Sequence, residues 1–101
     1  MDTIAWTIDD ILAATGGELL SGQRSCSFEG VSIDSRNISK SDLFVAIKGD
    51  RHDGHRFIPD VITTGIQGII IERRLADRQP IAKWQQEHIT CIGVDETIRA
   101  L

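Results

Sequence analysis

The sequence has few cysteines, no long apolar run and no excess of basic residues, and each absence narrows the class of protein. Two cysteines occur among the 101 residues, and the separation of Cys26 from Cys91 matches neither a zinc-ligand spacing nor a disulfide framework. Both lie in apolar, strand-like segments, so we expect buried, reduced thiols. No apolar run approaches the roughly 20 residues that span a bilayer, and no charged-then-apolar leader opens the chain. These features predict a soluble, cytoplasmic protein without a membrane span.

Several functional motifs are also missing. The sequence has neither G-x-x-x-x-G-K-[S/T] nor G-x-G-x-x-G, so nothing in it is suited to cradle ATP or a dinucleotide. The net charge of -4 and pI of about 5.2 disfavour general nucleic-acid binding. His52 and His55 have H-x-x-H spacing, but they span an Asp-Gly pair typical of a turn, and no further His or Cys supports a metal site. Ser35 has no evident base partner, which disfavours a nucleophilic role.

The residues that are present predict one small globular domain. Hydrophobic residues make up 41% of the chain and charged residues 26%, an ordinary globular balance. Thr7 is suited to cap a helix with Asp10 in a capping-box position, and Gly16-Gly17 is suited to end it. Pro59 fits the first turn of a second helix, which Gly65 would end. The pattern predicts strands over 18–21, about 28–34, 43–47, 68–71 and 89–94, helices over about 8–15, 57–62 and 82–87, and loops over 37–42 and 49–55.

This order of elements predicts an α/β layered domain whose mixed, partly parallel sheet is flanked by helices. The unit from Leu43 to Ile71 should be a right-handed strand–helix–strand crossover. Asp95 is suited to cap a helix that has scarcely begun at Leu101. We therefore expect a domain over residues 1–94, followed at 95–101 by the start of a helix that leads to a further domain.

Two polar loops follow apolar strands and contain the candidate binding residues. In open α/β sheets, ligands bind beyond the carboxyl ends of the strands. In the first loop, Ser35 and Arg36 could hold a phosphate or carboxylate. In the second loop, Gly49 and Gly54 permit close approach of a ligand to the backbone, with further donors from Arg51 and His52. The alternative for the first loop is a turn in which Asp34 pairs with Arg36, and for the second a solvated, charged loop.

The segment from Gly30 to Gly65 resembles the amino-terminal domain of the Mur ligases, which extend UDP-N-acetylmuramoyl peptides. Two branches of that family share the pattern: one adds the third amino acid of the stem peptide and the other adds D-alanyl-D-alanine. The opening Trp6–Leu12 and Thr15–Leu20 resemble the second branch. The shared residues are Asp34-Ser35-Arg36, Asp42-Leu43-Phe44-Val45-Ala46-Ile47-Lys48-Gly49, Asp53-Gly54-His55, Phe57-Ile58 and Gly65.

The resemblance implies a substrate-binding role for this domain. It implies that the UDP-muramoyl site is lined by Ile33, Ser35 and the loop Asp50-Arg51-His52. Arg36 and Asp34 would support that site, with Lys48 and Gly49 shaping the adjacent turn. Asp53 and Gly54 would also give structural support. Lys40-Ser41 replaces the Pro-Gly or similar turn usual in the family, and His52 stands where the family varies.

The resemblance also implies what the domain does not contain. In the family, ATP and magnesium bind to a central domain, and D-alanyl-D-alanine is held with help from a third domain. The terminal carboxylate of the substrate becomes an acyl phosphate, which the incoming amino group attacks with release of ADP and phosphate. We therefore expect no catalytic residue in these 101 positions and no ligase activity from this chain alone.

Three alternatives stay open at this stage. The sister ligase that adds the third stem-peptide amino acid shares the pattern. A non-catalytic sensing or regulatory domain of similar α/β architecture is the alternative from another class of protein. A fusion of the ligase to an alanine racemase is also compatible with the sequence.

Overall fold

The protein has the α/β architecture that its sequence predicts. The computed structural model describes residues 6–22, 27–34, 36, 38–39, 41–47 and 53–97. Its elements in chain order are β1 (Trp6–Thr7), α1 (Ile8–Thr15), β2 (Glu18–Ser21), β3 (Ser27–Phe28), β4 (Gly30–Ser32), β5 (Asp42–Val45), the 3-10 helix η1 (Gly54–Phe57), α2 (Ile58–Thr63), β6 (Gly68–Glu72), the 3-10 helix η2 (Arg73–Arg78), α3 (Ile81–Gln86) and β7 (Thr90–Val94).

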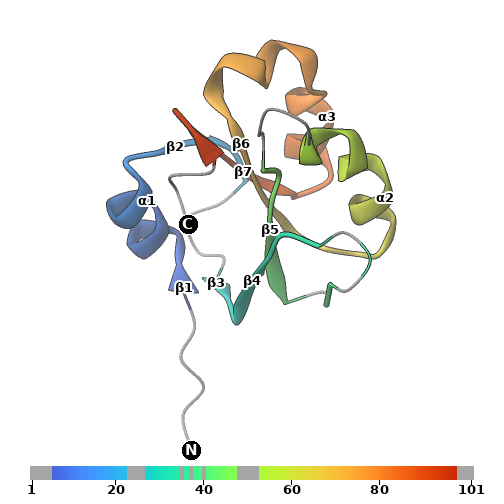
Figure 1. Ribbon diagram of the computed structural model, residues 1–101, viewed down its shortest axis with the longest axis horizontal. Coiled ribbons are helices and arrows are strands. Elements are labelled where there is room, and N and C mark those ends of the chain that lie inside the picture. The colour runs from blue at the N-terminus through green and yellow to red at the C-terminus, as the bar shows by residue number, and fades with distance from the viewer. Residues whose placement is uncertain are drawn as a thin grey trace, which may run out of the picture.

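The main sheet is mixed and mostly parallel. Its five strands lie in the order β2-β7-β6-β5-β4 (Figure 1). Strands β4, β5, β6 and β7 run parallel to one another, and β2 pairs antiparallel with β7. Strands β1 and β3 form a separate antiparallel pair. Because parallel strands end at the same edge of a sheet, the segments that follow β4 to β7 all begin at one edge.

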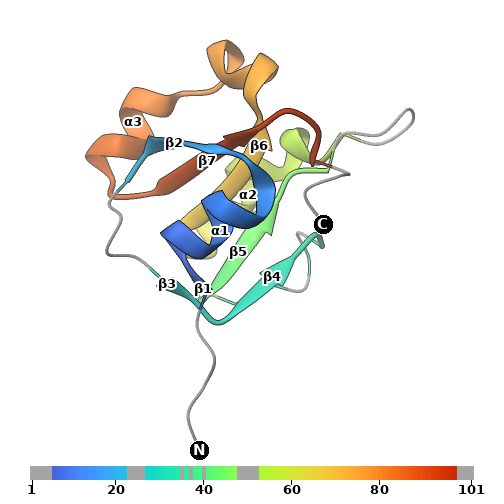
Figure 2. The same cartoon turned by 90° about the vertical axis from the view of Figure 1, so that its left-hand side faces the viewer.

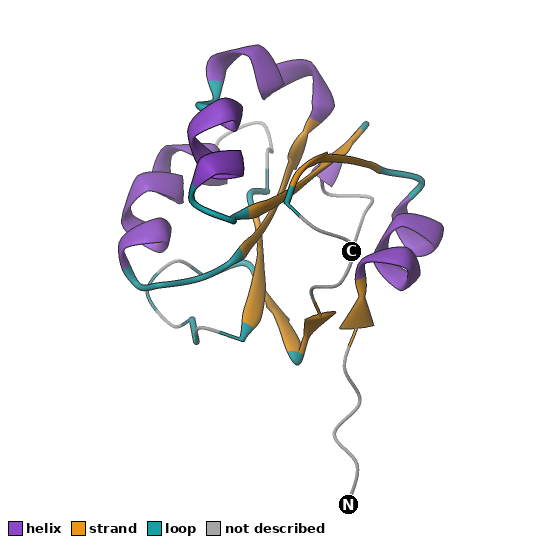
Figure 3. Cartoon of the chain, turned by 180° about the vertical axis from the view of Figure 1, so that it is seen from behind, coloured by secondary structure: helices purple, strands orange, loops and turns teal. Residues whose placement is uncertain are grey.

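Helices cover both faces of this sheet, which explains its continuous apolar strands. In β5 and the residue after it, Phe44 and Ala46 pack in the core shared with α2 and α3, whereas Leu43 and Val45 pack in the core shared with α1. Figures 1 and 3 show α1 on one side of the strands and the pair α2 and α3 on the other. The alternation of side chains along a strand therefore divides one apolar run between two cores.

Helix α1 begins and ends at the residues that the sequence predicts. The hydroxyl of Thr7 accepts the Asp10 N–H at 3.1 Å, and the Asp10 carboxylate accepts the Thr7 N–H at 3.2 Å. This is a capping box, which satisfies two amides that have no partner within the helix. Gly16 ends the helix in the left-handed conformation, at φ 67°.

Two strand ends differ from the prediction. The strand expected over about 28–34 is divided into β3 and β4 and ends at Ser32. Beyond that point Asp34 donates its N–H to the Ser32 hydroxyl at 3.2 Å, so a local turn replaces hydrogen bonding to the neighbouring strand. The strand expected over 43–47 ends at Val45, because the Ile47 N–H turns back to the Val45 carbonyl at 3.0 Å.

Two further segments are more helical than the sequence suggests. Residues 54–57, expected as loop and helix start, form η1, and α2 begins at Ile58 with Pro59 in its first turn. Gly65 follows α2 at φ 92°, as expected of a glycine that ends a helix. The polar segment 73–78 forms η2, for which the sequence has no apolar periodicity, and α3 begins at Ile81.

Some expectations fall outside the described residues or remain untested. The expected helix after Asp95 lies largely in residues outside the described ranges. Strands β5 and β6 are parallel neighbours, as a crossover between them requires. Within the described part of the chain, every helix is too short to cross a bilayer.

Candidate functional site

The candidate site lies at the carboxyl edge of the four parallel strands. The first predicted loop follows β4 and the second follows β5, and these two strands are parallel neighbours. Both loops therefore begin at the same edge (Figure 2). The segments after β6 and β7 begin there too. This edge is where ligands bind in open α/β sheets.

The first loop is exposed and weakly paired. Ile33 is 54% exposed, so its side chain is accessible to a ligand. Asp34 accepts the Arg36 N–H at 2.9 Å, and its carboxylate lies 3.6 Å from the Arg36 guanidinium Nε. The turn with an Asp34–Arg36 pair is thus present, as the alternative interpretation expects. Both partners are solvated, so the pair contributes little, and the guanidinium can still bind an anion. Ser35 lies outside the described residues.

The second loop is described only at its two ends. The predicted binding residues Lys48, Gly49, Asp50, Arg51 and His52 lie outside the described residues. On either side of them, the Gly54 N–H donates to the Ile47 carbonyl at 2.7 Å. The two ends of the loop therefore stand side by side at the end of β5.

Gly54 is required by this close approach. A Cβ atom on Gly54 would lie 2.8 Å from the Ile47 nitrogen and 3.1 Å from two backbone atoms of Ala46. Asp53 precedes it as the N-cap of η1, and its carboxylate accepts the His55 N–H at 3.0 Å. The Asp53 cap and the close approach of Gly54 thus place the returning end of the loop against the end of β5, and the supporting role of these two residues in a binding site stays a prediction.

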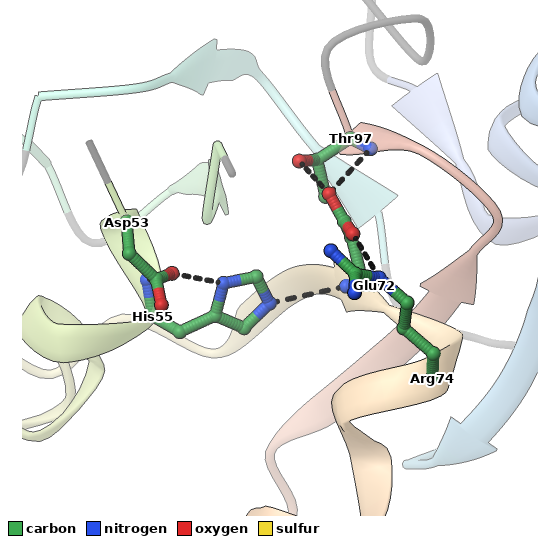
Figure 4. Close-up of polar contacts among 5 residues, drawn as sticks. All are labelled: Asp53, His55, Glu72, Arg74 and Thr97. Carbon is green, nitrogen blue, oxygen red and sulfur yellow. Dashed lines mark hydrogen bonds and ion pairs between the residues drawn. The ribbon is translucent and has the colours of Figure 1, made fainter. Parts of the chain in front are cut away.

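A buried histidine next to this loop was missed by the sequence analysis. The sequence places His55 in a polar loop, in an H-x-x-H pair and in the shared Asp53-Gly54-His55 pattern, none of which predicts burial, whereas the structure buries its side chain to 4% exposure. Its Nδ1 lies 2.7 Å from an Asp53 carboxylate oxygen, and its Nε2 accepts the Glu72 N–H at 3.1 Å. Figure 4 shows the ring between Asp53 and the end of β6.

Glu72 extends this polar cluster and was also missed. Its carboxylate, only 4% exposed, lies 2.9 Å from Nε of Arg74. The other carboxylate oxygen accepts the Thr97 hydroxyl at 3.1 Å and the Thr97 N–H at 3.4 Å. An acidic residue directly after Ile69-Ile70-Ile71 was the available signal, because a carboxylate that ends a buried strand must find partners there.

An apolar pocket of about 270 Å³ lies on the α1 side of the sheet. Its lining is apolar, so it is better suited to a flat or apolar group than to a phosphate. Trp6 and Val31, which are 44% and 49% exposed, belong to this lining. The complete set is Trp6, Ile11, Ala14, Thr15, Val31, Leu43, Val45 and Ile70.

In the part of the chain that the structure describes, the donor set does not fit a metal ion or a nucleoside triphosphate. Among the described residues, no three His, Cys, Asp or Glu side chains gather as potential metal ligands. The complete sequence has no phosphate-binding loop of the G-x-x-x-x-G-K-[S/T] type. We therefore assign no ATP or magnesium site to these residues.

The fold is a small α/β domain of the class in which ligands bind beyond the carboxyl ends of the strands. A family model described as "Mur ligase family, catalytic domain" matches residues 27–101, which is most of the chain. The chain belongs to the Mur ligase family, and the predicted family resemblance is confirmed.

Its relatives include both branches of the family. It is 32% identical over 97 residues to UDP-N-acetylmuramoyl-tripeptide–D-alanyl-D-alanine ligase of Treponema pallidum, covering 94% of this chain and 21% of that protein. It is 31% identical over 94 residues to UDP-N-acetylmuramoyl-L-alanyl-D-glutamate–2,6-diaminopimelate ligase of Clostridium perfringens, covering 93% of this chain and 18% of that protein.

A solved structure with the same fold is MurF from Acinetobacter baumannii. The TM-score is 0.75 at 28% identity, over 99% of this chain and 20% of that one. The chain thus spans about a fifth of the length of these relatives.

Proposed function

We propose that this chain is the amino-terminal, substrate-binding domain of an ATP-dependent ligase that adds D-alanyl-D-alanine to UDP-N-acetylmuramoyl-tripeptide in peptidoglycan synthesis. The UDP-muramoyl end binds at the carboxyl edge of β4 and β5. The observation that supports this is the convergence of two polar loops after neighbouring parallel strands. In this proposal, ATP, magnesium and D-alanyl-D-alanine bind to other domains of the full-length ligase, which follow residues 95–101.

Arg36 is the described residue best suited to hold the diphosphate. Its side chain is 90% exposed, and it makes a loose ion pair with Asp34. A planar guanidinium binds phosphate oxygens through two parallel hydrogen bonds. Ile33, exposed beside it, offers an apolar surface for the uridine, and Ser35 with residues 48–52 supplies the remaining donors in this proposal.

Titration of the 101-residue chain with UDP-N-acetylmuramoyl-tripeptide tests the binding site. The amide signals of Ile33, Arg36 and Gly54 should shift in the NMR spectrum. Arg36→Gln should weaken binding roughly ten-fold or more, because it removes charged hydrogen bonds. Lys83→Gln is the matched control: it removes one positive charge from α3, where Lys83 is 70% exposed, and should leave the affinity unchanged.

Amide shifts confined to α2 and α3, or equal losses of affinity in the Arg36→Gln and Lys83→Gln variants, would contradict this binding site. The same chain mixed with ATP, magnesium, the tripeptide substrate and D-alanyl-D-alanine should release no ADP. The full-length protein is the positive control for that reaction.

The second candidate is the ligase that adds the third stem-peptide residue, as the diaminopimelate ligase relatives do. It is favoured by a nearly equal identity of 31% over 94 residues. Assays of the full-length protein distinguish the two. The proposed branch forms ADP with UDP-N-acetylmuramoyl-tripeptide and D-alanyl-D-alanine, and the alternative forms ADP with the dipeptide precursor and diaminopimelate.

A further inference from the structure

The heavy-atom geometry assigns one tautomer to His55. Its Nε2 faces the backbone N–H of Glu72 at 3.1 Å, so Nε2 must be the acceptor and carry no proton. The proton of the neutral ring then lies on Nδ1, which donates to Asp53 Oδ1 at 2.7 Å. With the side chain only 4% exposed, water cannot readily replace either partner. The ring therefore bridges the residue that caps η1 and the end of β6.

Glu72 carries this connection to a third strand. Its backbone binds His55, and its buried carboxylate binds the backbone and hydroxyl of Thr97, three residues beyond β7. Figure 4 shows the contacts as one continuous chain from Asp53 through His55 and Glu72 to Thr97. Hydrogen-bond chains of this kind hold a fixed geometry because each buried group depends on its neighbour for its partner.

The charged groups around His55 come from three segments. Asp53 faces Nδ1 from the ring's own segment. Glu72, on β6, presents its backbone to Nε2 and turns its carboxylate towards Thr97 and Arg74. Arg74, on η2, pairs with that carboxylate at 2.9 Å. Among the described residues, the ring thus has one acidic partner, Asp53, and it contacts β6 through an uncharged amide.

We propose that His55, as the Nδ1–H tautomer, is a positioning residue that fastens the returning end of the β5 loop to β6 and, through Glu72, to the segment leaving β7. The hydrogen bond from Gly54 to Ile47 holds the loop end against β5, and His55 adds a side-chain contact from that segment to β6. The proposal rests on the proposed function only in taking this edge as the substrate-binding edge. The contacts themselves involve no substrate.

Two substitutions of His55 test the contacts of Nδ1 and Nε2 separately. Glutamine at position 55 can place an amide oxygen near the position of Nε2 and keep an acceptor for the Glu72 N–H. Asparagine reaches only the position of Nδ1, so it keeps the contact to Asp53 and leaves the Glu72 N–H without its acceptor. A side chain that merely filled space would respond to both changes alike, whereas the proposed contact depends on which half is kept.

The first measurement is the NMR spectrum of the imidazole nitrogens in the unsubstituted 101-residue chain, which identifies the protonated nitrogen. A proton on Nδ1 at neutral pH is expected, and a proton on Nε2 would overturn the proposal. This measurement needs neither a variant nor a ligand. Its failure is therefore distinct from failure of the substrate titration.

The second measurement is hydrogen exchange at the Glu72 amide, referred to the Ile70 amide of the same strand. His55→Asn should raise the relative exchange rate roughly ten-fold, as expected when a buried donor loses its acceptor. His55→Gln should raise it less than about three-fold. Equal rates in the two variants, or no change in either, would overturn the proposal. If the asparagine variant does not fold, retained protection in the glutamine variant supports the proposal and lost protection contradicts it.

Discussion

At the scale of single residues, the Asp53-Gly54-His55 triplet has a physical explanation at each position. Asp53 caps η1, Gly54 lets the backbone approach β5, and His55 reaches across to β6. Each role depends on the chemistry of that residue type: a carboxylate acceptor, the absence of a Cβ atom, and a ring with one donor and one acceptor. The triplet can therefore be essential to the edge without itself touching a ligand.

Gly54→Ala should destabilise the fold more than Gly16→Ala. The added Cβ at position 54 would press on backbone atoms at 2.8 and 3.1 Å, which cannot move independently of β5. We expect a loss of about 1–3 kcal/mol, the range for overpacking. Gly16 has open space around it but φ 67°, so its substitution measures the conformational cost alone, about 1–2 kcal/mol. Urea denaturation of both variants checks the order, and a smaller loss at position 54 would contradict the steric argument.

At the scale of elements, the ends of α1 follow from local capping alone, whereas the ends of β4 and β5 also depend on strand pairing. The capping box at Thr7 and the left-handed Gly16 lie within the helix's own sequence. The ends of β4 and β5 depend on turns at Ser32 and Val45 that compete with pairing to a neighbouring strand. Local signals therefore place a helix more securely than a strand end in this protein.

Thr7→Ala should lower the free energy of unfolding by about 1 kcal/mol, the usual contribution of an N-cap side chain. The substitution removes the acceptor of the Asp10 N–H at 3.1 Å. Thr7→Ser is the matched control, because serine keeps the hydroxyl and should retain most of the stability. The measurement is urea denaturation followed by circular dichroism. A serine variant as unstable as the alanine variant would show that the methyl group, not the cap, carries the effect.

At the scale of the whole molecule, two cores share one sheet, and Cys91 lies on β7, an interior strand of that sheet. Its strand, β7, is bordered by β6 on one side and β2 on the other, and its side chain is fully buried. Burial raises the pKa of the Cys91 thiol from 9.0 to about 12. The thiol is therefore protonated in the folded protein at neutral pH, as the prediction of a buried, reduced cysteine requires.

This shift predicts an alkaline loss of stability. A thiol with a raised pKa in the folded state contributes stability fully below its unfolded value of 9.0, and that contribution is lost as the pH rises towards about 12. Urea midpoints between pH 8 and 11 should fall more steeply in Cys26→Ser than in Cys26→Ser/Cys91→Ala. The other titrating groups are common to both proteins, so parallel slopes would contradict a role for Cys91.

Much of the fold could be predicted because its signals are local. The capping residues of α1, the apolar strand at β5 with its two faces, and Pro59 at the start of α2 each lie within a few residues of the structure they determine. The order of these elements then restricted the topology to a layered α/β domain, and the pattern from Asp34 to Gly65 indicated the Mur ligase family. The proposed position of the binding edge follows from that topology and not from any single residue.

The tertiary structure alone decided the polar cluster at that edge. His55 and Glu72 are 17 residues apart, and Glu72 and Thr97 are 25 apart, so no local pattern links them. Their contacts exist because three parallel strands end side by side, where buried polar groups must find partners that the chain brings from elsewhere. The sequence by itself determined which elements form and in what order, since those choices depend on neighbouring residues. Which side chains meet at their ends was decided only by packing.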